Sequence, residues 1–257
     1  MCIRDRNWIL FLIVLLPVLL FAQTEGVVKY TETIALQIEL PEGMEEFASQ
    51  IPSSQTVKQV LYFNENQALF NNDDNRKTED TMEGGSEESG VQFRMDFQMP
   101  EHIVFCDLKE GKITEKQDFM GKTFLIKREM KKYKWKMTGE QKKILDYPCM
   151  KATYEKDSTM VVAWFTPQIP VSAGPSRYTG LPGMILEMEF NDGQRKVVAT
   201  EVELKALEKD TIVAPKKGKK VTHEEYKKIQ EEKMKELEQE LGGSSGGSGT
   251  RIIIRGN

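Results

Sequence analysis

Hydrophobic and polar residues alternate along most of the chain from residue 27 onward. In residues 27–40 the apolar side chains fall on even positions, namely Val28, Tyr30, Ile34, Leu36, Ile38 and Leu40. The same period of two recurs in residues 91–99, 133–138 and 184–190. Successive side chains of a strand point to opposite faces, so this period predicts strands with one buried face.

Shorter apolar or alternating segments fill the intervals between these strands, and turn-forming residues separate them. They are residues 56–63, 67–70, 103–106, 112–119, 122–128, 142–147, 148–156, 159–165 and 194–207. The connections are too short to hold crossover helices, which predicts antiparallel neighbours in a meander. We therefore predict a mainly β fold, a large antiparallel meander sheet that is curled or half-barrel-like to hide its apolar face.

One long C-terminal helix is also expected. Thr222 lies three residues before Glu225, which is typical of a capping box, and the helical pattern extends to about Leu241. Its apolar stripe is thin, so we expect most of its surface to be solvated. A second, shorter helical pattern covers residues 43–51, and the polar, glycine-rich residues 76–90 predict a loop.

The N-terminal residues predict export. Residues 8–22 are apolar and uncharged and follow Arg4 and Arg6, which fits a signal peptide and is short of the roughly 20 residues of a membrane span. An uncleaved anchor remains the alternative. The opening residues MCIRDR resemble translated sequencing adapter, so Cys2 carries no argument.

Four segments follow from these patterns. We expect a signal peptide over residues 1–22 and a single antiparallel β domain over 23–214. A basic hinge, which includes residues 216–220, and the charged helix then occupy 215–241, and a flexible glycine-serine tether with a short strand-like tail occupies 242–257. No membrane span remains after signal cleavage.

Composition and charge exclude several function classes. The chain has 36 Lys and Arg against 40 Asp and Glu, a net charge of −4, and nothing in that balance indicates sequence-independent binding of nucleic acid, which would need a basic face. The only histidines, His102 and His223, have no second ligand at metal-binding spacing. Catalytic and phosphate-binding motifs are also absent from the sequence, so we expect no enzyme activity, metal or cofactor.

Cys106 and Cys149 each lie in or beside a strand-like segment. In an exported protein they could form a disulfide across neighbouring strands, worth roughly 4 kcal/mol in the chain-entropy model. Alternatively, they are two separately buried thiols that pack as small apolar side chains. The sequence leaves both interpretations open.

A proline-rich segment precedes the strand at residues 184–190. Its prolines are Pro167, Pro170, Pro175 and Pro182. Each proline removes a backbone donor, so the segment predicts a stiff, extended connection over one end of the sheet. Within it, Leu181-Pro182-Gly183-Met184 has the proline and glycine positions of a type II turn.

This connection is the candidate binding loop. Its candidate residues are Trp164, Phe165, Arg177, Tyr178, Gly180, Leu181, Pro182 and Gly183. One interpretation is a structural lid that closes the curled sheet. The other is a recognition surface, in which preset turns hold Arg177 and Tyr178 toward a partner at a low cost of ordering.

Residues 164–190 closely resemble the signature block of the GLPGLI family, exported proteins of unknown function in Gram-negative bacteria. Residues 180–183 and Ile185 match the motif after which the family is named, and Met184 stands where the name has leucine. The resemblance implies an exported location and a shared fold. It implies no activity and no catalytic residues.

From these observations we expect a non-catalytic envelope module that binds a protein or peptide partner. The alternative is a carrier of an apolar, lipid-like ligand in a curved sheet, because methionine makes adaptable linings. The methionines of the predicted apolar stripes are Met95, Met99, Met137, Met184 and Met188. The sequence predicts neither the partner nor the oligomeric state.

Overall fold

The structure is a computed structural model that describes residues 24–36, 53–73, 81–86, 91–96, 101–156 and 159–242. The predicted signal peptide, the helix predicted over residues 43–51 and the C-terminal tail beyond residue 242 lie outside the described residues.

Most of the described chain forms one sheet of 12 strands, which confirms the mainly β prediction. In chain order its strands are β1 (Gly26–Ala35), β2 (Ser54–Phe63), β3 (Gln67–Asn72), β6 (His102–Asp107), β7 (Lys112–Phe119), β8 (Lys122–Glu129), β9 (Lys136–Ile144), β10 (Tyr147–Lys156), β11 (Thr159–Thr166), β12 (Met184–Phe190), β13 (Arg195–Leu204) and β14 (Lys219–Thr222). A separate hairpin comprises β4 (Thr81–Ser86) and β5 (Val91–Asp96), and α1 covers His223–Gly242.

The sheet grows outward from β1 in both directions. Its spatial order is β14-β8-β7-β6-β3-β2-β1-β13-β12-β11-β10-β9. The first half of the chain therefore runs from β1 to β8, and the second half starts at the opposite edge with β9 and returns to β13 beside β1. All neighbours are antiparallel except β14 and β8, which are parallel and so depart from the predicted arrangement.

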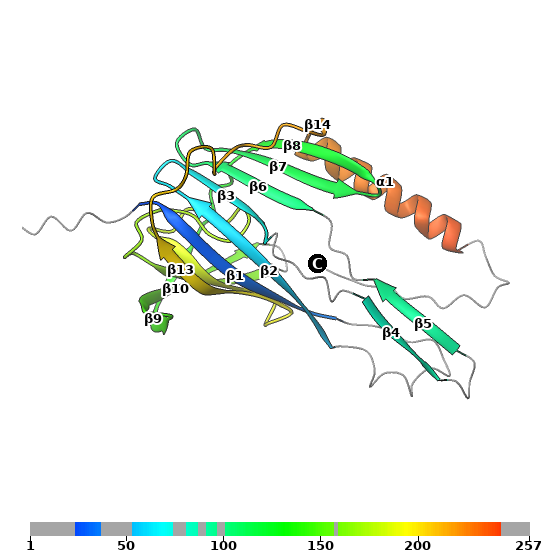
Figure 1. The fold of residues 1–257 in the computed structure, drawn as a ribbon, viewed down its shortest axis with the longest axis horizontal. Helices are drawn as coiled ribbons and strands as arrows, with labels where there is room; N and C mark the ends of the chain where they lie inside the picture. Colours follow the sequence, from blue (N-terminus) through cyan, green and yellow to red (C-terminus); the bar gives the residue numbers. More distant parts are fainter. Residues whose placement is uncertain are drawn as a thin grey trace, which may run out of the picture.

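The short connection between β8 and β9 shows that the sheet is curled. In a flat sheet these two strands would lie ten strand spacings apart, about 48 Å. Residues 130–135 can span only roughly 25 Å. The sheet must therefore bend its two ends toward each other while remaining open at β14 and β9. Figure 1 shows β7, β8 and β14 as one wall and β9, β10 and β13 as the other.

The inner face of this curl carries the apolar core. Tyr30, Phe63, Phe165, Met184 and Leu186 are all at most 1% exposed and belong to one hydrophobic cluster. The connection over residues 167–183 enters the same cluster. Its buried side chains there are Ile169, Val171, Ala173 and Leu181. The chain thus covers the apolar face of its own sheet, as the lid interpretation predicts.

Backbone hydrogen bonds attach this connection to β12. Met184 donates to the carbonyl of Ile169 at 3.0 Å, and Ile185 donates to that of Ala173 at 2.9 Å. The Tyr30 hydroxyl of β1 donates to the carbonyl of Ile185 at 2.7 Å. Because this site is fully buried, each of these groups needs a partner inside the protein.

The long helix and its predicted N-terminus are confirmed. Thr222 and Glu225 form the reciprocal capping box, since Thr222 N donates to Glu225 Oε2 at 2.7 Å and Glu225 N donates to Thr222 Oγ1 at 3.2 Å. Tyr226 packs edge-on against Phe124 of β8, with ring centroids 5.2 Å apart. The helix therefore rests one edge on the sheet at the β8 end.

Three local predictions were wrong. The strand β4 lies within residues 76–90, which were predicted to be a loop, and β14 begins inside the predicted basic hinge. Residues 133–138 were predicted as one strand, but β9 begins only at Lys136. Their alternation has another cause, because an extended segment that crosses the open side of a curl also turns every second side chain inward.

Replacement of Tyr30 by phenylalanine tests the attachment of the connection. Tyr30→Phe keeps the ring but leaves the buried carbonyl of Ile185 without its side-chain donor, so the free energy of unfolding should fall by about 1–2 kcal/mol in urea titrations. Tyr62→Phe on the same sheet is the control, because Tyr62 is only half-buried. Equal effects of the two substitutions would contradict the assignment.

Candidate functional site

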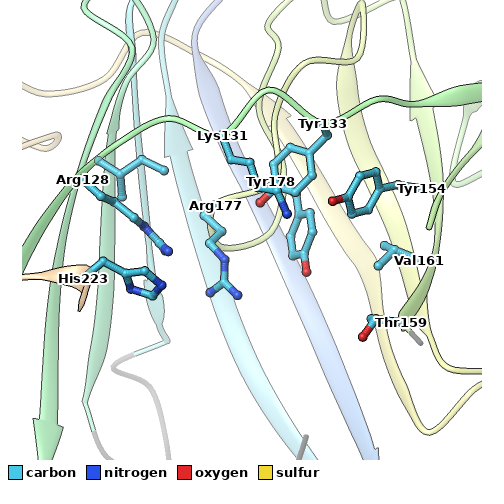
Figure 2. A pocket seen from close by; sticks show the side chains of 10 residues that line it. Arg128, Lys131, Tyr133, Tyr154, Thr159, Val161, Arg177, Tyr178 and His223 are labelled. Carbon is cyan, nitrogen blue, oxygen red and sulfur yellow. The ribbon is translucent and has the colours of Figure 1, made fainter. Parts of the chain in front are cut away.

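A cavity of about 460 Å³ remains on the inner side of the sheet, within the usual size range of ligand sites. It lies where the connection over residues 167–183, the segment 130–135 and the start of α1 meet. Its lining residues are Ile113, Arg128, Lys131, Tyr133, Tyr154, Thr159, Val161, Arg177, Tyr178 and His223. Figure 2 shows Arg128 and His223 on one side, Tyr154, Val161 and Thr159 on the other, and Arg177 between them.

Tight turns place Arg177 and Tyr178 in this cavity. Ser176 adopts a left-handed backbone conformation with φ of 57°, and Tyr178 N donates to the carbonyl of Pro175 at 3.4 Å. On the other side, Gly180 has φ of 91° and its N–H donates to Ser172 Oγ at 2.8 Å. The two side chains are thus presented by a loop whose backbone is held at both ends.

The Leu181-Pro182-Gly183 segment differs from the predicted type II turn. Gly183 N donates to the carbonyl of Leu181 at 2.8 Å, which closes a three-residue turn around Pro182. Gly183 has φ of 150°, and a Cβ on it would lie 2.1 Å from the carbonyl oxygen of Thr166. Glycine is required here because the start of β12 passes directly against the end of β11.

The structure separates the predicted binding residues into four groups, of which Trp164 alone forms the last. Arg177 and Tyr178 line the cavity. Phe165 and Leu181 belong to the core, with Gly183 buried beside them, whereas Gly180 and Pro182 are exposed.

Trp164 points to the outer face of the sheet, where the Lys142 ammonium lies 4.3 Å from its ring centroid. Neighbouring residues of a strand face opposite sides, so Trp164 and Phe165 could not both have faced one ligand.

Aromatic rings form one wall of the cavity. Tyr133 lies 5.2 Å from Tyr154 and 5.1 Å from Tyr178, and 5.7 Å from Trp135 of the same segment, measured between ring centroids. Trp135 in turn donates its Nε1 hydrogen to the carbonyl of Thr179 at 2.9 Å. The segment that joins β8 to β9 is therefore fastened to the candidate loop by ring contacts and a hydrogen bond.

The charged side chains of the lining are all basic. Arg128, Lys131, Arg177 and His223 come from four different parts of the chain, and the lining includes no Asp or Glu. The Lys131 ammonium lies 4.9 Å from the ring centroid of Tyr154, a favourable cation–π contact. Arg128 forms an ion pair with the buried carboxylate of Glu115 on β7.

The pKa values around the cavity indicate a positive potential. Burial and then the charge of Arg177 lower the pKa of the Arg128 guanidinium to about 10. Burial and then Arg177 also lower the pKa of His102 to about 4. For His223 the pKa is lowered by burial and then by Arg128. In each case a nearby cation disfavours a further positive charge.

A row of polar side chains borders the cavity on the inner face. Glu32 on β1 accepts from Gln59 Nε2 at 2.5 Å and pairs with Arg195, and it is 3% exposed. On β7, Glu115 pairs with Arg128 and lies 3.8 Å from His102 Nε2. Sequence reasoning missed this row. The available signal was Glu32 itself, which interrupts the apolar even positions of the first strand.

The two cysteines are free thiols that lie far apart in the sheet, so the disulfide is not formed and the alternative interpretation holds. Cys106 is on β6 and Cys149 on β10, and six strands lie between them. Burial raises the pKa of Cys106 to about 12 and that of Cys149 to about 11. Both thiols are therefore protonated and poorly reactive in the folded protein.

Within the described residues, His, Cys, Asp and Glu side chains form no group suited to a metal ion. The same part of the chain contains no helix that is both long and apolar enough to cross a membrane.

Comparison with known proteins concerns mainly the fold. A family described as "Protein of unknown function (Porph_ging)" matches residues 154–187, which include the candidate loop with Arg177 and Tyr178. No curated protein sequence matches the chain.

Two solved structures of PNGF-II are similar to this chain. The one in the P21 space group has a TM-score of 0.53 and 17% identity, covering 80% of this chain and 33% of that one. The one in the C2 space group has a TM-score of 0.50 and 19% identity, covering 79% and 32%. This chain thus spans about a third of their length, and at such identities the likeness shows the fold alone.

Glycine substitution tests the packing of the loop against β11. Gly183→Ala should lower the free energy of unfolding by about 2 kcal/mol or more, because the added Cβ meets the Thr166 carbonyl. Gly193→Ala is the matched control, since Gly193 also has positive φ but has no atom closer than 3.8 Å to the new Cβ. It should cost about 1 kcal/mol. Equal losses in urea titrations would contradict the close approach.

Thiol labelling tests the separate cysteines. In native protein at pH 8 a maleimide should label the peptides carrying Cys106 and Cys149 slowly, because burial raises the pKa of both thiols. In denaturant, without reductant, both peptides should be labelled completely, as measured by mass spectrometry. A disulfide-linked peptide pair under those conditions would overturn the assignment.

Proposed function

We propose that the chain is a non-catalytic binding module of an exported envelope protein and that a segment of its protein or peptide partner enters the cavity beside Arg177 and Tyr178. The observation that carries the proposal is the cavity of about 460 Å³ beside the connection. Two side chains of the connection line this space, and both belong to residue types that are enriched at binding hot spots.

The arrangement of the loop supports binding. The backbone on either side of Arg177 and Tyr178 is held by the hydrogen bonds of Tyr178 N and Gly180 N, and the Tyr178 ring packs 5.5 Å from Phe190. A partner therefore meets side chains that are already ordered, which lowers the entropic cost of association.

The apolar-carrier alternative has less support. Its motivation was methionine on the inner face, but Met184 and Met188 are fully buried in the core and Met137 is 53% exposed. The side chains of Met95 and Met99 lie outside the described ones. The cavity lining combines four basic residues with three tyrosines, which suits a polar ligand better than a lipid chain.

Export and membership of the GLPGLI family belong to the same proposal. The matching family carries a different name, and its description gives no function. Its match over residues 154–187 covers most of the segment on which the GLPGLI resemblance is based, which is consistent with an uncharacterised family. The absence of enzyme activity is likewise proposed, on the absence of catalytic motifs from the sequence.

Photo-crosslinking tests the proposed function. A photoreactive phenylalanine analogue at position 178, in protein produced in its own bacterium, should form an adduct with a distinct protein or peptide. The same analogue at position 62, also a half-buried tyrosine but outside the cavity lining, is the control. Identical adducts at both positions, or none at 178, would contradict the proposal.

The double substitution Arg177→Ala/Tyr178→Ala separates recognition from a purely structural role. Under the proposed function, capture of the crosslinked partner should fall at least about tenfold while the melting temperature changes little. Lys58→Ala/Tyr62→Ala provides the matched control outside the cavity. If the first variant captured the partner as well as this control does, recognition by Arg177 and Tyr178 would be contradicted.

A further inference from the structure

We propose that the ligand of this cavity carries an acidic group, a carboxylate or a phosphate, beside a flat ring, and that Arg128, Arg177 and His223 receive the acidic group. The inference rests on the proposed function and adds the chemistry that the site selects.

The first argument is convergence. Arg128 comes from β8, Arg177 from the connection before β12 and His223 from the first turn of α1, and all three line one cavity. In Figure 2 their side chains occupy the same side and the centre of the space, whereas Tyr154, Val161 and Thr159 face them. Three basic side chains thus gather at one end and the centre of the cavity, whereas the aromatic end carries the hydroxyl groups and the Lys131 ammonium beside the Tyr154 ring.

The second argument is charge balance. Glu115 is the only described carboxylate that forms an ion pair with a basic residue of the lining, and it pairs with Arg128. In the described part of the chain no carboxylate forms an ion pair with Arg177, whose guanidinium carbon lies 5.8 Å from the Tyr178 ring centroid. An oxyanion would supply the missing negative charge, and guanidinium groups bind carboxylate and phosphate with paired hydrogen bonds.

Arg128 also retains unused donor capacity. Its Nη2 group bonds Glu115, but its buried Nε has no hydrogen-bond partner among the described residues. An unsatisfied buried donor costs free energy, so an acceptor on a ligand would be favourable here. The ion pair with Glu115 already holds this side chain in place. The positive end of the α1 dipole, next to His223, adds to the attraction for an anion.

The tyrosines on the opposite side of the cavity favour a ligand with a ring. The ring centroids of Tyr178 and Tyr154 lie 5.1 and 5.2 Å from that of Tyr133, and all three residues line the cavity. The Lys131 ammonium lies over the Tyr133 and Tyr154 rings. Burial raises the pKa of Tyr133 to about 12, so its hydroxyl stays protonated and is available as a donor. A single aromatic ring with its acidic group fits a cavity of about 460 Å³.

Binding should depend on pH through His223. Its lowered pKa in the free protein follows from burial, from Arg128 of β8, and from Arg177 of the connection. On its own helix, Glu224 opposes this shift and Lys227 adds to it. A bound oxyanion raises this pKa, so the complex takes up a proton. The affinity should therefore increase as the pH falls through the pKa of the complex and be independent of pH well above it.

Isothermal titration calorimetry on the full chain tests the proposal with four small probes. Benzoate and phenyl phosphate should bind, and benzyl alcohol and inorganic phosphate should bind at least about tenfold more weakly, because each lacks one half of the recognised pair. A peptide that ends in phenylalanine, compared with its C-terminal amide, distinguishes a peptide source of the acid from a free ring acid. Binding of the acid form alone would assign the carboxylate of a peptide.

Three variants locate the site. Arg177→Gln should weaken phenyl phosphate binding at least about tenfold, whereas Lys143→Gln, which removes an exposed charge outside the cavity, should not. His223→Gln changes an exposed residue and should abolish the pH dependence of benzoate binding between about pH 5.5 and 8 without unfolding the protein. Benzoate is the probe here because its carboxyl group stays ionised over this range, whereas phenyl phosphate itself titrates at about pH 6.

The proposal is overturned if benzyl alcohol binds as well as benzoate, if no acidic probe binds at about 10 mM, or if Arg177→Gln has no effect. The two proposals fail separately. If a partner is crosslinked at position 178 but neutral and acidic probes bind equally well, the proposed acidic ligand is wrong and the proposed binding function stands. Anion binding without any crosslinked partner would do the reverse.

Discussion

The fold depends on covering one apolar face with the chain's own connection. A single open sheet of 12 strands has no second layer, and α1 packs at the sheet end formed by β7, β8 and β14. The side chains of Ile169, Val171 and Leu181 supply the missing layer, and each contributes about 1.5–3 kcal/mol by burial. An irregular buried segment is stable only when its backbone N–H and C=O groups form hydrogen bonds. Here the N–H groups of Met184 and Ile185 donate to carbonyls of the connection, and the Tyr30 hydroxyl donates to the Ile185 carbonyl.

The same constraint determines where the cavity lies. The connection covers the apolar part of the inner face, and the row with Glu32 and Glu115 borders the part it leaves open. Buried charges are costly unless paired, and each of these carboxylates has a basic partner, Arg195 or Arg128. Arg177 adds another positive charge, and no carboxylate of the described residues forms an ion pair with it. The basic character of the cavity thus results from the way the connection meets the polar row.

Sequence patterns predicted the fold better than the site. The period of two identified strands such as β7 and β12 at their observed bounds, and the capping box placed the start of α1, because both signals are local. Arg128 and Arg177 meet only through the curl of the sheet, which no local pattern encodes. The alternation around Tyr133 was misassigned to a strand for the same reason. The placement of Trp164 was predictable, since strand parity already sets it opposite Phe165.

The Gly-Leu-Pro-Gly segment shows why a lid and a recognition surface need not be alternatives. One side of the connection, with Leu181, is in the core, and another side, with Arg177 and Tyr178, lines the cavity. Gly183 allows β12 to start against the Thr166 carbonyl, and this contact sets the position of everything before it in the loop. Under the proposed function, the packing of Leu181 would therefore be what holds Arg177 in place. A loop that packs into the core for stability can then also hold binding side chains in place, because packing fixes the residues that support a site.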